Sequence, residues 1–161
     1  KVIDVGTGSG CLIISISQEL KKQHISLIGT DISKKALDIA KKNDSKKKVI
    51  FKQKDLLDEN DLDENILVIA NLPYIPTEMY MQLDKEVKDY EPRTALDGGV
   101  DGLLYYKKLF DTIKGSKKRI LFLIEIEPST LGALQEYTNG IPFEVFKDFR
   151  KRYRFILFHF S

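Results

Sequence analysis

Short apolar runs alternate along the chain with stretches whose apolar residues recur every three or four positions. The runs are rich in Val, Ile and Phe, as buried strands are, whereas the other stretches are typical of amphipathic helices. The pattern predicts strands at residues 2–5, 26–30, 49–53, 66–70, 119–126, 142–146 and 153–160. It predicts helices at residues 11–22, 34–43, 101–114 and 129–138.

The order of these elements predicts an α/β fold with a mainly parallel sheet and helices on both faces. The last two strands differ from the others, because only residues 147–152 join them. A parallel pair needs a crossover connection of about a dozen residues. We therefore expect a seven-stranded sheet with six parallel strands and a reversed last strand. This arrangement resembles the Rossmann-like class I methyltransferases rather than the nicotinamide-binding domains.

Length and composition fit one domain with its own core, since the chain has 161 residues, of which 42% are hydrophobic and 31% charged. The apolar runs are much shorter than the ~20 residues of a membrane helix, and no signal peptide opens the chain. We expect a cytoplasmic protein that does not enter a membrane. The single cysteine, Cys11, and the two histidines, His24 and His159, do not make a zinc site, so we expect no metal.

The charge pattern gives little indication of a nucleic-acid partner. The formal net charge is only +2, and the lysine clusters at 46–48 and 117–119 are read as solvated loops. We expect a monomer that does not bind nucleic acid.

The chain opens directly with a core strand and no helix before it. Residues 1–161 are therefore interpreted as the catalytic domain of a longer protein.

The segment "DVGTGSGC", residues 4–11, places three glycines between a strand and a helix. Without Cβ atoms the backbone can approach a ligand closely, and the N–H groups at the helix start can point at it. A nucleotide-like cofactor is therefore predicted at Gly6, Thr7, Gly8, Ser9 and Gly10. The dinucleotide fingerprint needs a glycine where the chain has Cys11 or Ile13, which argues against hydride transfer. The alternative is a tight turn without a ligand.

Asp31 in "GTDIS" ends the second predicted strand, 21 residues after Gly10. A carboxylate at this point of a nucleotide-binding unit accepts hydrogen bonds from the ribose hydroxyls. We predict this role for Asp31, with Ile32 beside it in the cofactor site. The alternative is that Asp31 or Ser33 only caps the next helix. Both functions are compatible if Ser33 caps and Asp31 is free for the sugar.

Asp55 and Leu56 follow the third predicted strand. The carboxylate of Asp55 is suited to accept from an adenine amino group, and Leu56 is suited to cover the ring. For Asp55 the alternative is an ordinary surface aspartate.

The segment "VIANLPYIP", residues 68–76, runs from an apolar strand into an amide and two prolines. Pro73 and Pro76 cannot donate ladder hydrogen bonds, so the strand ends before them. Asn71 therefore lies at the carboxyl end of a strand, where open α/β sheets bind ligands. The alternative is a plain strand-ending turn.

Five segments together resemble the HemK/PrmC family, the methyltransferases of peptide chain release factors. They are "DVGTGSGCLIISIS", "GTDISKKALDIAKKN", "NLPYIP", "DYEPRTALDGGVDGLLYYKKL" and "KDFRKRYRFI", and they span nearly the whole chain. The glycine loop is common to class I enzymes, whereas "YEPRTALDGGVDGL" combined with Asn-x-Pro-Tyr is more specific. The resemblance implies S-adenosylmethionine as cofactor and, as substrate, the glutamine of a release factor's Gly-Gly-Gln loop, methylated on its side-chain nitrogen. It also implies an N-terminal domain that recognises the release factor and is absent here.

The resemblance assigns catalysis to Asn71, Leu72, Pro73 and Tyr74. The Asn71 side-chain oxygen and the Leu72 carbonyl would accept the two N–H bonds of the substrate amide and stabilise its developing charge. Pro73 would stiffen the loop, Tyr74 would pack on the amide, and Asn71 would also touch the cofactor. The family usually has proline where this chain has Leu72. Because leucine also supplies the carbonyl, Leu72→Pro is expected to leave turnover equal or better.

The segment 91–103 is assigned to the wall of the substrate cleft by resemblance alone. Asp101 is predicted to cap a helix that begins at Gly102, and Glu91 either serves the chemistry or anchors the loop. Three other functions stay open. They are methylation of an adenine amine in DNA, which needs base flipping, methylation of a ribosomal-protein glutamine, and cofactor binding without catalysis.

Overall fold

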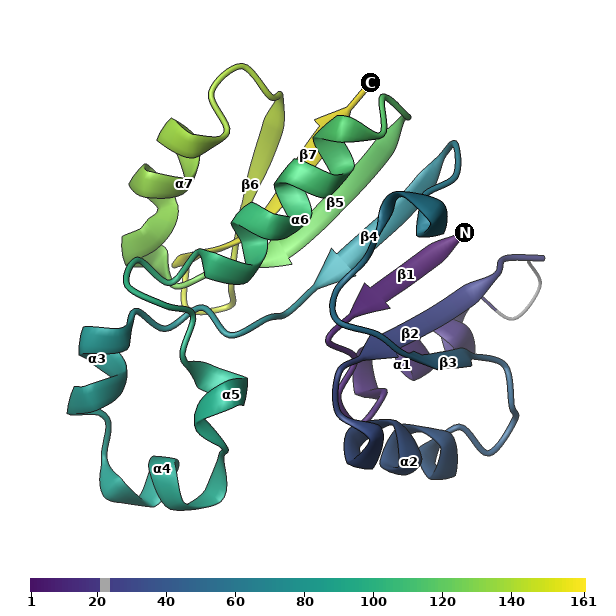
Figure 1. Cartoon of the computed structure of the whole chain (residues 1–161), viewed down its shortest axis with the longest axis horizontal. Helices are drawn as coiled ribbons and strands as arrows, with labels where there is room; N and C mark the ends of the chain where they lie inside the picture. Colours follow the sequence, from purple (N-terminus) through teal and green to yellow (C-terminus); the bar gives the residue numbers. More distant parts are fainter. Residues whose placement is uncertain (21–23) are drawn as a thin grey trace.

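The computed structural model describes residues 1–20 and 24–161, which build one twisted sheet flanked by helices (Figure 1). The strands are β1 (Val2–Val5), β2 (Leu27–Asp31), β3 (Ile50–Gln53), β4 (Ile66–Ala70), β5 (Ile120–Glu125), β6 (Phe143–Lys147) and β7 (Tyr153–Phe160). Within the described residues the sheet order is β3-β2-β1-β4-β5-β7-β6. Strand β7 is antiparallel to both β5 and β6, and the other pairs are parallel. The predicted six parallel strands and one reversed strand are confirmed.

The helices are α1 (Cys11–Glu19), α2 (Lys34–Asn43), α3 (Thr77–Gln82), α4 (Lys85–Tyr90), α5 (Arg93–Leu96), α6 (Leu104–Gly115) and α7 (Leu131–Tyr137), with 3₁₀ turns η1 (Glu59–Asp61) and η2 (Pro128–Thr130). The predicted helix 34–43 is confirmed, and its N-cap is Ser33, whose hydroxyl accepts from the Ala36 N–H at 3.3 Å. The predicted helix 11–22 ends at Glu19, and positions 21 and 22 lie outside the described residues. No helix of the described chain has the length and apolarity to cross a membrane.

Helices α3, α4 and α5 were not predicted, and they form a lobe beside the carboxyl ends of the strands (Figure 1). The prediction that Asp101 caps a helix from Gly102 is wrong, because α6 begins at Leu104. Gly102 has a φ of +73°, which is not helical. The Asp101 carboxylate instead accepts from the Leu103 N–H at 3.0 Å, in the turn before the helix.

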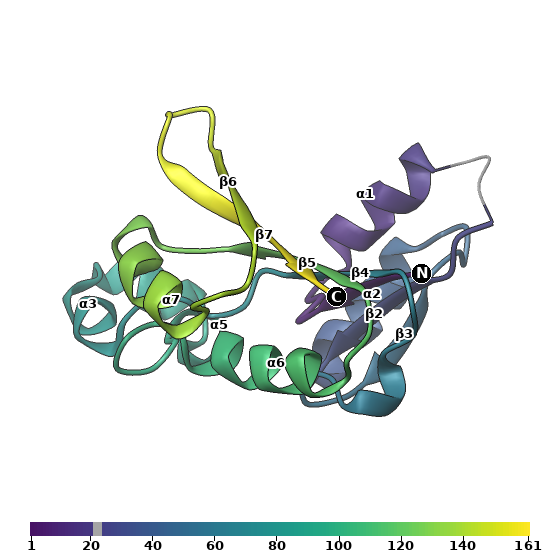
Figure 2. The ribbon, with the colours of Figure 1, turned by 90° about the horizontal axis from the view of Figure 1, so that it is seen from above.

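The core lies on both faces of the sheet. Figure 2 shows α1 on one side of the strands and α6 and α7 on the other. On the α6 side, Phe110 packs edge-on against Phe122 and Phe158, with ring centroids 5.2 and 4.7 Å apart. A smaller apolar cluster, which includes Ile13 and Ile69, lies between α1 and the sheet. The sheet is thereby fixed between layers, and its carboxyl edge carries the loops described next.

Candidate active site

The loops after β1, β2 and β4 meet at one edge of the sheet. Val5, the last residue of β1, pairs with Thr30 of β2 and with Ala70 of β4, and all three strands run in the same direction. The segments that follow therefore lie side by side around a cavity of about 410 Å³. This volume is within the usual range of small-molecule sites. Among the predicted cofactor residues, those that line the cavity are Gly6, Gly8, Asp31, Ile32, Asp55, Leu56 and Asn71.

Asp31 connects the glycine loop to the end of β2. One carboxylate oxygen accepts from the Gly8 N–H at 2.9 Å, and the other accepts from the Ser33 N–H at 2.8 Å. The sequence analysis assumed that Asp31 is free for the sugar, but the carboxylate already makes these two hydrogen bonds. Each carboxylate oxygen still has capacity for a second hydrogen bond, because an ionised carboxylate offers about four acceptor sites.

Thr7, Ser9 and Gly10 support the loop and do not line the cavity. The Thr7 hydroxyl points inward and donates to Asp4 at 2.6 Å. The Ser9 carbonyl accepts from the Asn43 side chain at 2.9 Å. A Cβ at Gly10 would lie 3.1 Å from the Ala40 side chain, so this glycine allows α1 and α2 to pack closely.

Asp4 is a site residue that the sequence interpretation missed. It is only 2% exposed, and burial raises the pKa of its carboxyl to about 6, against the lowering effects of the Thr7 and Ile13 hydrogen bonds. A carboxyl group inside a buried strand, two residues before the first glycine of the loop, was the signal in the sequence. Its contacts indicate that Asp4 fixes the loop from beneath.

Other residues of the cavity wall were not predicted as cofactor contacts, although the segment 91–103 was predicted to line the substrate cleft. They are Ser33, Ala36, Lys54, Pro92, Thr94, Ala95 and Tyr105. Pro92, Thr94 and Ala95 lie in or next to α5, so the lobe forms part of this wall. Lys54 is held by an ion pair with Asp58 at 2.6 Å and by a second pair with Asp61.

A second cavity, of about 260 Å³, adjoins the first along the segment after β4. It is lined by Asn71, Leu72, Pro73, Tyr74, Ile75, Glu91, Ala95 and Leu96. Asn71, Leu72, Pro73 and Ala95 line both cavities, and the consecutive residues Asn71, Leu72 and Pro73 form the partition between them. Within the described chain no hydrogen bond or ion pair engages the Glu91 carboxylate.

Leu72 is fixed through both its backbone and its side chain. Its N–H donates to the Tyr106 hydroxyl at 3.1 Å, and this hydroxyl donates to the Glu125 carbonyl at the end of β5. The Leu72 side chain is 6% exposed and covers Gly6, where a Cβ would lie 2.6 Å from the leucine Cδ2. Leu72→Pro would therefore lose a hydrogen bond that the sequence argument did not foresee, and its effect on turnover stays a prediction.

Tyr74 is held at the outer end of the partition. Its hydroxyl donates to Glu125 Oε1 at 3.1 Å, and the Arg154 guanidinium lies over its ring, 5.5 Å from the centroid. Burial, and then the charge of Glu125, raise the pKa of Tyr74 to about 12. Tyr74 is therefore neutral at physiological pH and offers a flat face and a fixed hydroxyl.

The glycines of "DGGVDG", residues 97–102, allow this turn to lie against the partition. The Ile75 N–H donates to the Leu96 carbonyl at 3.0 Å, and the Gly98 N–H donates to the Ile75 carbonyl at 2.8 Å. A Cβ at Gly98 would lie 2.6 Å from the Pro73 carbonyl, and one at Gly102 would collide with the Tyr74 carbonyl. Backbone packs directly on backbone here, which places the lobe against the second cavity.

The described residues contain no cluster of His, Cys, Asp and Glu that would hold a metal ion. The Asn71 side chain and the Leu72 backbone offer an amide oxygen and a carbonyl oxygen between the two cavities. The larger cavity is also lined by two acidic side chains, Asp31 and Asp55.

Comparison with known proteins places the chain among methyltransferases. A family model described as "Methyltransferase domain" matches residues 1–87, just over half of the chain. A release factor glutamine methyltransferase from Dictyoglomus turgidum is 34% identical over 92% of this chain and 55% of its own length. The enzymes of the same name from Rhodopirellula baltica and Bacillus cereus are 36% and 35% identical over 86% and 78% of this chain, and 49% and 45% of their own lengths. The chain thus spans about half the length of these relatives.

Solved structures support the fold. A SAM-dependent methyltransferase from Aquifex aeolicus superimposes with a TM-score of 0.58 at 15% identity, over 98% of this chain and 80% of that one. A human methyltransferase 10 domain containing protein gives a TM-score of 0.64 at 17% identity, over 99% and 70%. The chain therefore belongs to the methyltransferase domain family, and the curated relatives that it resembles over most of its length are release factor glutamine methyltransferases.

Proposed function

We propose that this protein transfers a methyl group from S-adenosylmethionine to the side-chain amide nitrogen of the glutamine in the Gly-Gly-Gln loop of a peptide chain release factor. The observation that carries the proposal is the pair of cavities that meet at Asn71, Leu72 and Pro73. A donor and an acceptor molecule, one in each cavity, would face each other across this partition. The names of the relatives supply the substrate class. Residues 1–161 are proposed to be the catalytic domain of a cytoplasmic monomer.

The larger cavity fits the cofactor. Gly8 has a φ of +56° and nothing lies within 4 Å of the position of an added Cβ, so its backbone faces open space. Asp31 would accept from the ribose hydroxyls and Asp55 from the adenine amino group, while Ile32 and Leu56 would contact the ring. When bound, the cofactor supplies an electrophilic methyl group on a sulfonium.

The smaller cavity fits a side-chain amide. The Asn71 side-chain oxygen and the Leu72 carbonyl would accept the two N–H bonds and aim the nitrogen at the partition. The Tyr106 hydroxyl oxygen lies 3.4 Å from the Leu72 carbonyl oxygen and closer to the Glu125 carbonyl oxygen. Because a carbonyl oxygen has two lone pairs, Leu72 keeps an acceptor site for the substrate. The ring of Tyr74 would pack on the planar amide, and the lobe would exclude water.

These contacts address the difficulty of the reaction. An amide nitrogen is a poor nucleophile because its lone pair is delocalised into the carbonyl. Placement of the nitrogen lowers the entropic part of the barrier, and the two fixed acceptors stabilise the positive charge that develops as the C–N bond forms. The methyl–sulfur bond would break as the C–N bond forms, which would leave a neutral thioether. The nitrogen would then release one proton to solvent and become a secondary amide, so no base is needed before the transfer.

The test offers three substrates side by side with labelled cofactor: an intact release factor, a ribosomal protein and DNA. We expect label on the release factor alone, and none when the glutamine of its Gly-Gly-Gln loop is replaced by alanine. Label on DNA or on the ribosomal protein would support the corresponding alternative. Absence of cofactor binding by calorimetry would contradict the proposal as a whole.

A further inference from the structure

The turn between β6 and β7 carries an exposed group of aromatic and basic side chains. We define the hairpin tip as residues 146–153, which read "FKDFRKRY". Phe149 is 91% exposed, and Phe146 and Tyr153 are 44% and 47% exposed. Figure 2 shows this turn projecting beyond the sheet, on the side where α1 lies. Folding does not explain such an exposure of a large apolar ring next to several cations.

The hairpin tip has a positive charge that the tip itself does not neutralise. Its one acid, Asp148, is engaged by the Arg152 guanidinium at 2.9 Å and by the Arg152 N–H at 2.9 Å. Lys147 lies over the ring of Tyr153, 4.6 Å from the centroid, and Arg150 lies over Phe149 at 5.6 Å. Among the described residues no carboxylate forms an ion pair with Lys147, Arg150 or Lys151. These cations are available to an outside anion.

The hairpin tip lies at the same edge of the sheet as the second cavity. It follows the carboxyl end of β6, which runs in the direction of β4 and β5. Arg154, directly after the tip, lies over the ring of Tyr74, and Tyr74 lines the second cavity. Since even a fully extended strand rises only about 3.3 Å per residue, Lys151 is at most about 10 Å along the chain from Arg154. A macromolecule with one side chain in that cavity would extend over the tip.

We propose that the hairpin tip is a docking surface for an acidic patch on the protein substrate, beside the residue to be methylated. This inference rests on the proposed function and extends it to substrate recognition. Cations at the rim of an interface raise the association rate and select the orientation of the partner, and exposed aromatic side chains serve as anchors. A protein is favoured over a nucleic acid, because the proposed function, on which this inference rests, brings the glutamine of a protein into the adjoining cavity.

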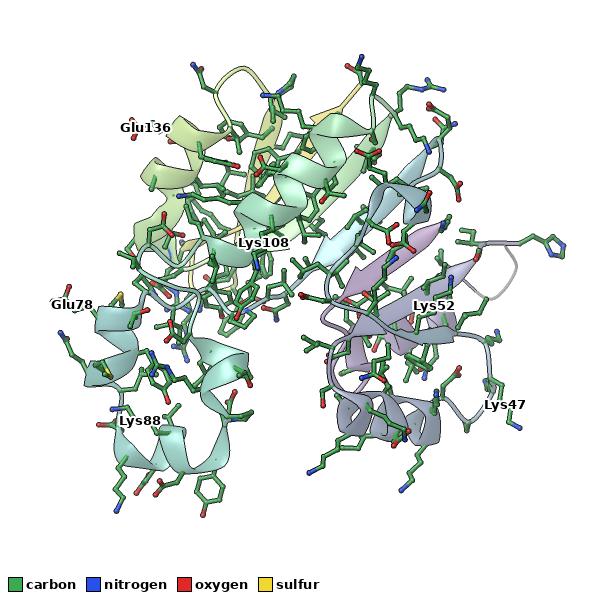
Figure 3. The ribbon with its side chains drawn as sticks, viewed as in Figure 1. Lys47, Lys52, Glu78, Lys88, Lys108 and Glu136 are labelled. Atoms are coloured by element: carbon green, nitrogen blue, oxygen red, sulfur yellow. The ribbon has the colours of Figure 1, made fainter. Side chains whose placement is uncertain are left out.

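The test measures steady-state methylation with two substrates, an intact release factor and a short peptide that contains Gly-Gly-Gln. The tip variant is Arg150→Glu/Lys151→Glu, and a second variant is Phe149→Ala. The matched control is Lys46→Glu/Lys48→Glu, which makes the same change of charge in the loop before β3. Lys47, which is labelled in Figure 3, shows that this loop lies far from the hairpin. Cofactor affinity by calorimetry and thermal unfolding confirm that each variant is folded.

We expect the tip variant to raise KM for the intact release factor by about tenfold or more, and Phe149→Ala to raise it less. KM for the peptide, cofactor affinity and the control variant should be unchanged, and added salt should reduce the difference between wild type and tip variant. Unchanged KM for the intact protein, or an equal rise for the peptide, would overturn the docking proposal while the proposed function stands. Loss of binding to a single-stranded RNA probe without a change in KM would also overturn it, in favour of nucleic acid. A wild-type protein that methylates neither substrate would refute the proposed function itself.

Discussion

The backbone N–H of Leu72 donates to the hydroxyl of Tyr106, a residue of α6 that is fully buried. The same hydroxyl reaches the Glu125 carbonyl, so one side chain joins the segment after β4 to the end of β5. Burial raises the pKa of Tyr106, which keeps the hydroxyl neutral and able to donate. The position of the Leu72 carbonyl, on which the proposed chemistry depends, is thus set from inside the core.

Tyr106→Phe should lower the free energy of unfolding by about 1–3 kcal/mol, because it leaves the Leu72 N–H buried without an acceptor. Methyl transfer should slow while cofactor affinity changes little. Leu72→Pro removes the other partner of the same bond, so the double variant should lose less stability than the sum of the single variants. Urea denaturation of the four proteins gives the coupling energy. Full additivity would show that the bond does not contribute.

Gly6→Ala and Gly8→Ala should separate loop packing from cofactor contact. Both positions have a positive φ, +68° and +56°, which costs an alanine about 1–2 kcal/mol. Only at Gly6 does the new methyl group also meet the Leu72 side chain, so Gly6→Ala should be the less stable variant and Leu72→Ala should partly rescue it. Gly8→Ala should mainly weaken cofactor binding. Thermal unfolding and calorimetry together check this, and the reverse order of effects would contradict it.

Asp31→Ala should weaken S-adenosylmethionine binding by at least about tenfold, since charge-assisted hydrogen bonds contribute roughly 1.5–3 kcal/mol each. The variant also loses the acceptors for the Gly8 and Ser33 N–H groups. Asp38→Ala is the matched control, because Asp38 lies on α2 and, among the residues that the structure describes, forms an ion pair only with the exposed Lys34. Calorimetry measures both. An unchanged affinity for folded Asp31→Ala would rule out the ribose assignment.

Asp4 should make the protein less stable as pH rises. Its pKa in the folded protein is about 6, above the ordinary value of 3.8, so its stabilising contribution is complete below about pH 4 and is lost as the pH rises through 6. The difference corresponds to about 3 kcal/mol. The stability of wild type relative to Asp4→Asn should therefore fall by an amount of this order between pH 4 and pH 7. Chemical denaturation across this range measures the difference, and a flat difference would contradict the assigned pKa.

The sheet could be predicted closely because apolar runs and connection lengths fix it. The predicted strand 119–126 is Ile120–Glu125, and the short connection at 147–152 correctly required a reversed β7. Helices α3 to α5 could not be predicted, since each has only four to six residues, and these are mostly exposed. Their positions depend on tertiary contacts such as the Asp97 carboxylate, which accepts from Thr77 at 2.7 Å and from Arg93 at 2.8 Å.

The candidate site was predictable where polar residues follow strands, as Asp31, Asp55 and Asn71 do. The site was not predictable where the polar atom of a buried core residue forms a hydrogen bond with a segment that is distant in the sequence. Tyr106 fits the apolar period of its helix, and its partner Leu72 lies 34 residues away in the sequence. Thr7 was predicted to contact the ligand because it lies in the glycine loop. In the structure its hydroxyl instead donates to the buried Asp4.

Single-turnover methylation of an intact release factor by Asn71→Ala tests the central claim most directly, with cofactor affinity measured in parallel. Asn71 lines both cavities and is proposed to supply one of two acceptors for the substrate amide. We predict a fall in rate of about 10²-fold or more, a size taken from the removal of one oxyanion-hole donor, with a much smaller change in cofactor affinity. Asn71→Asp should be milder, because a carboxylate still accepts and favours the developing positive charge. Wild-type rates in both variants would contradict the account and leave Asn71 as a turn residue.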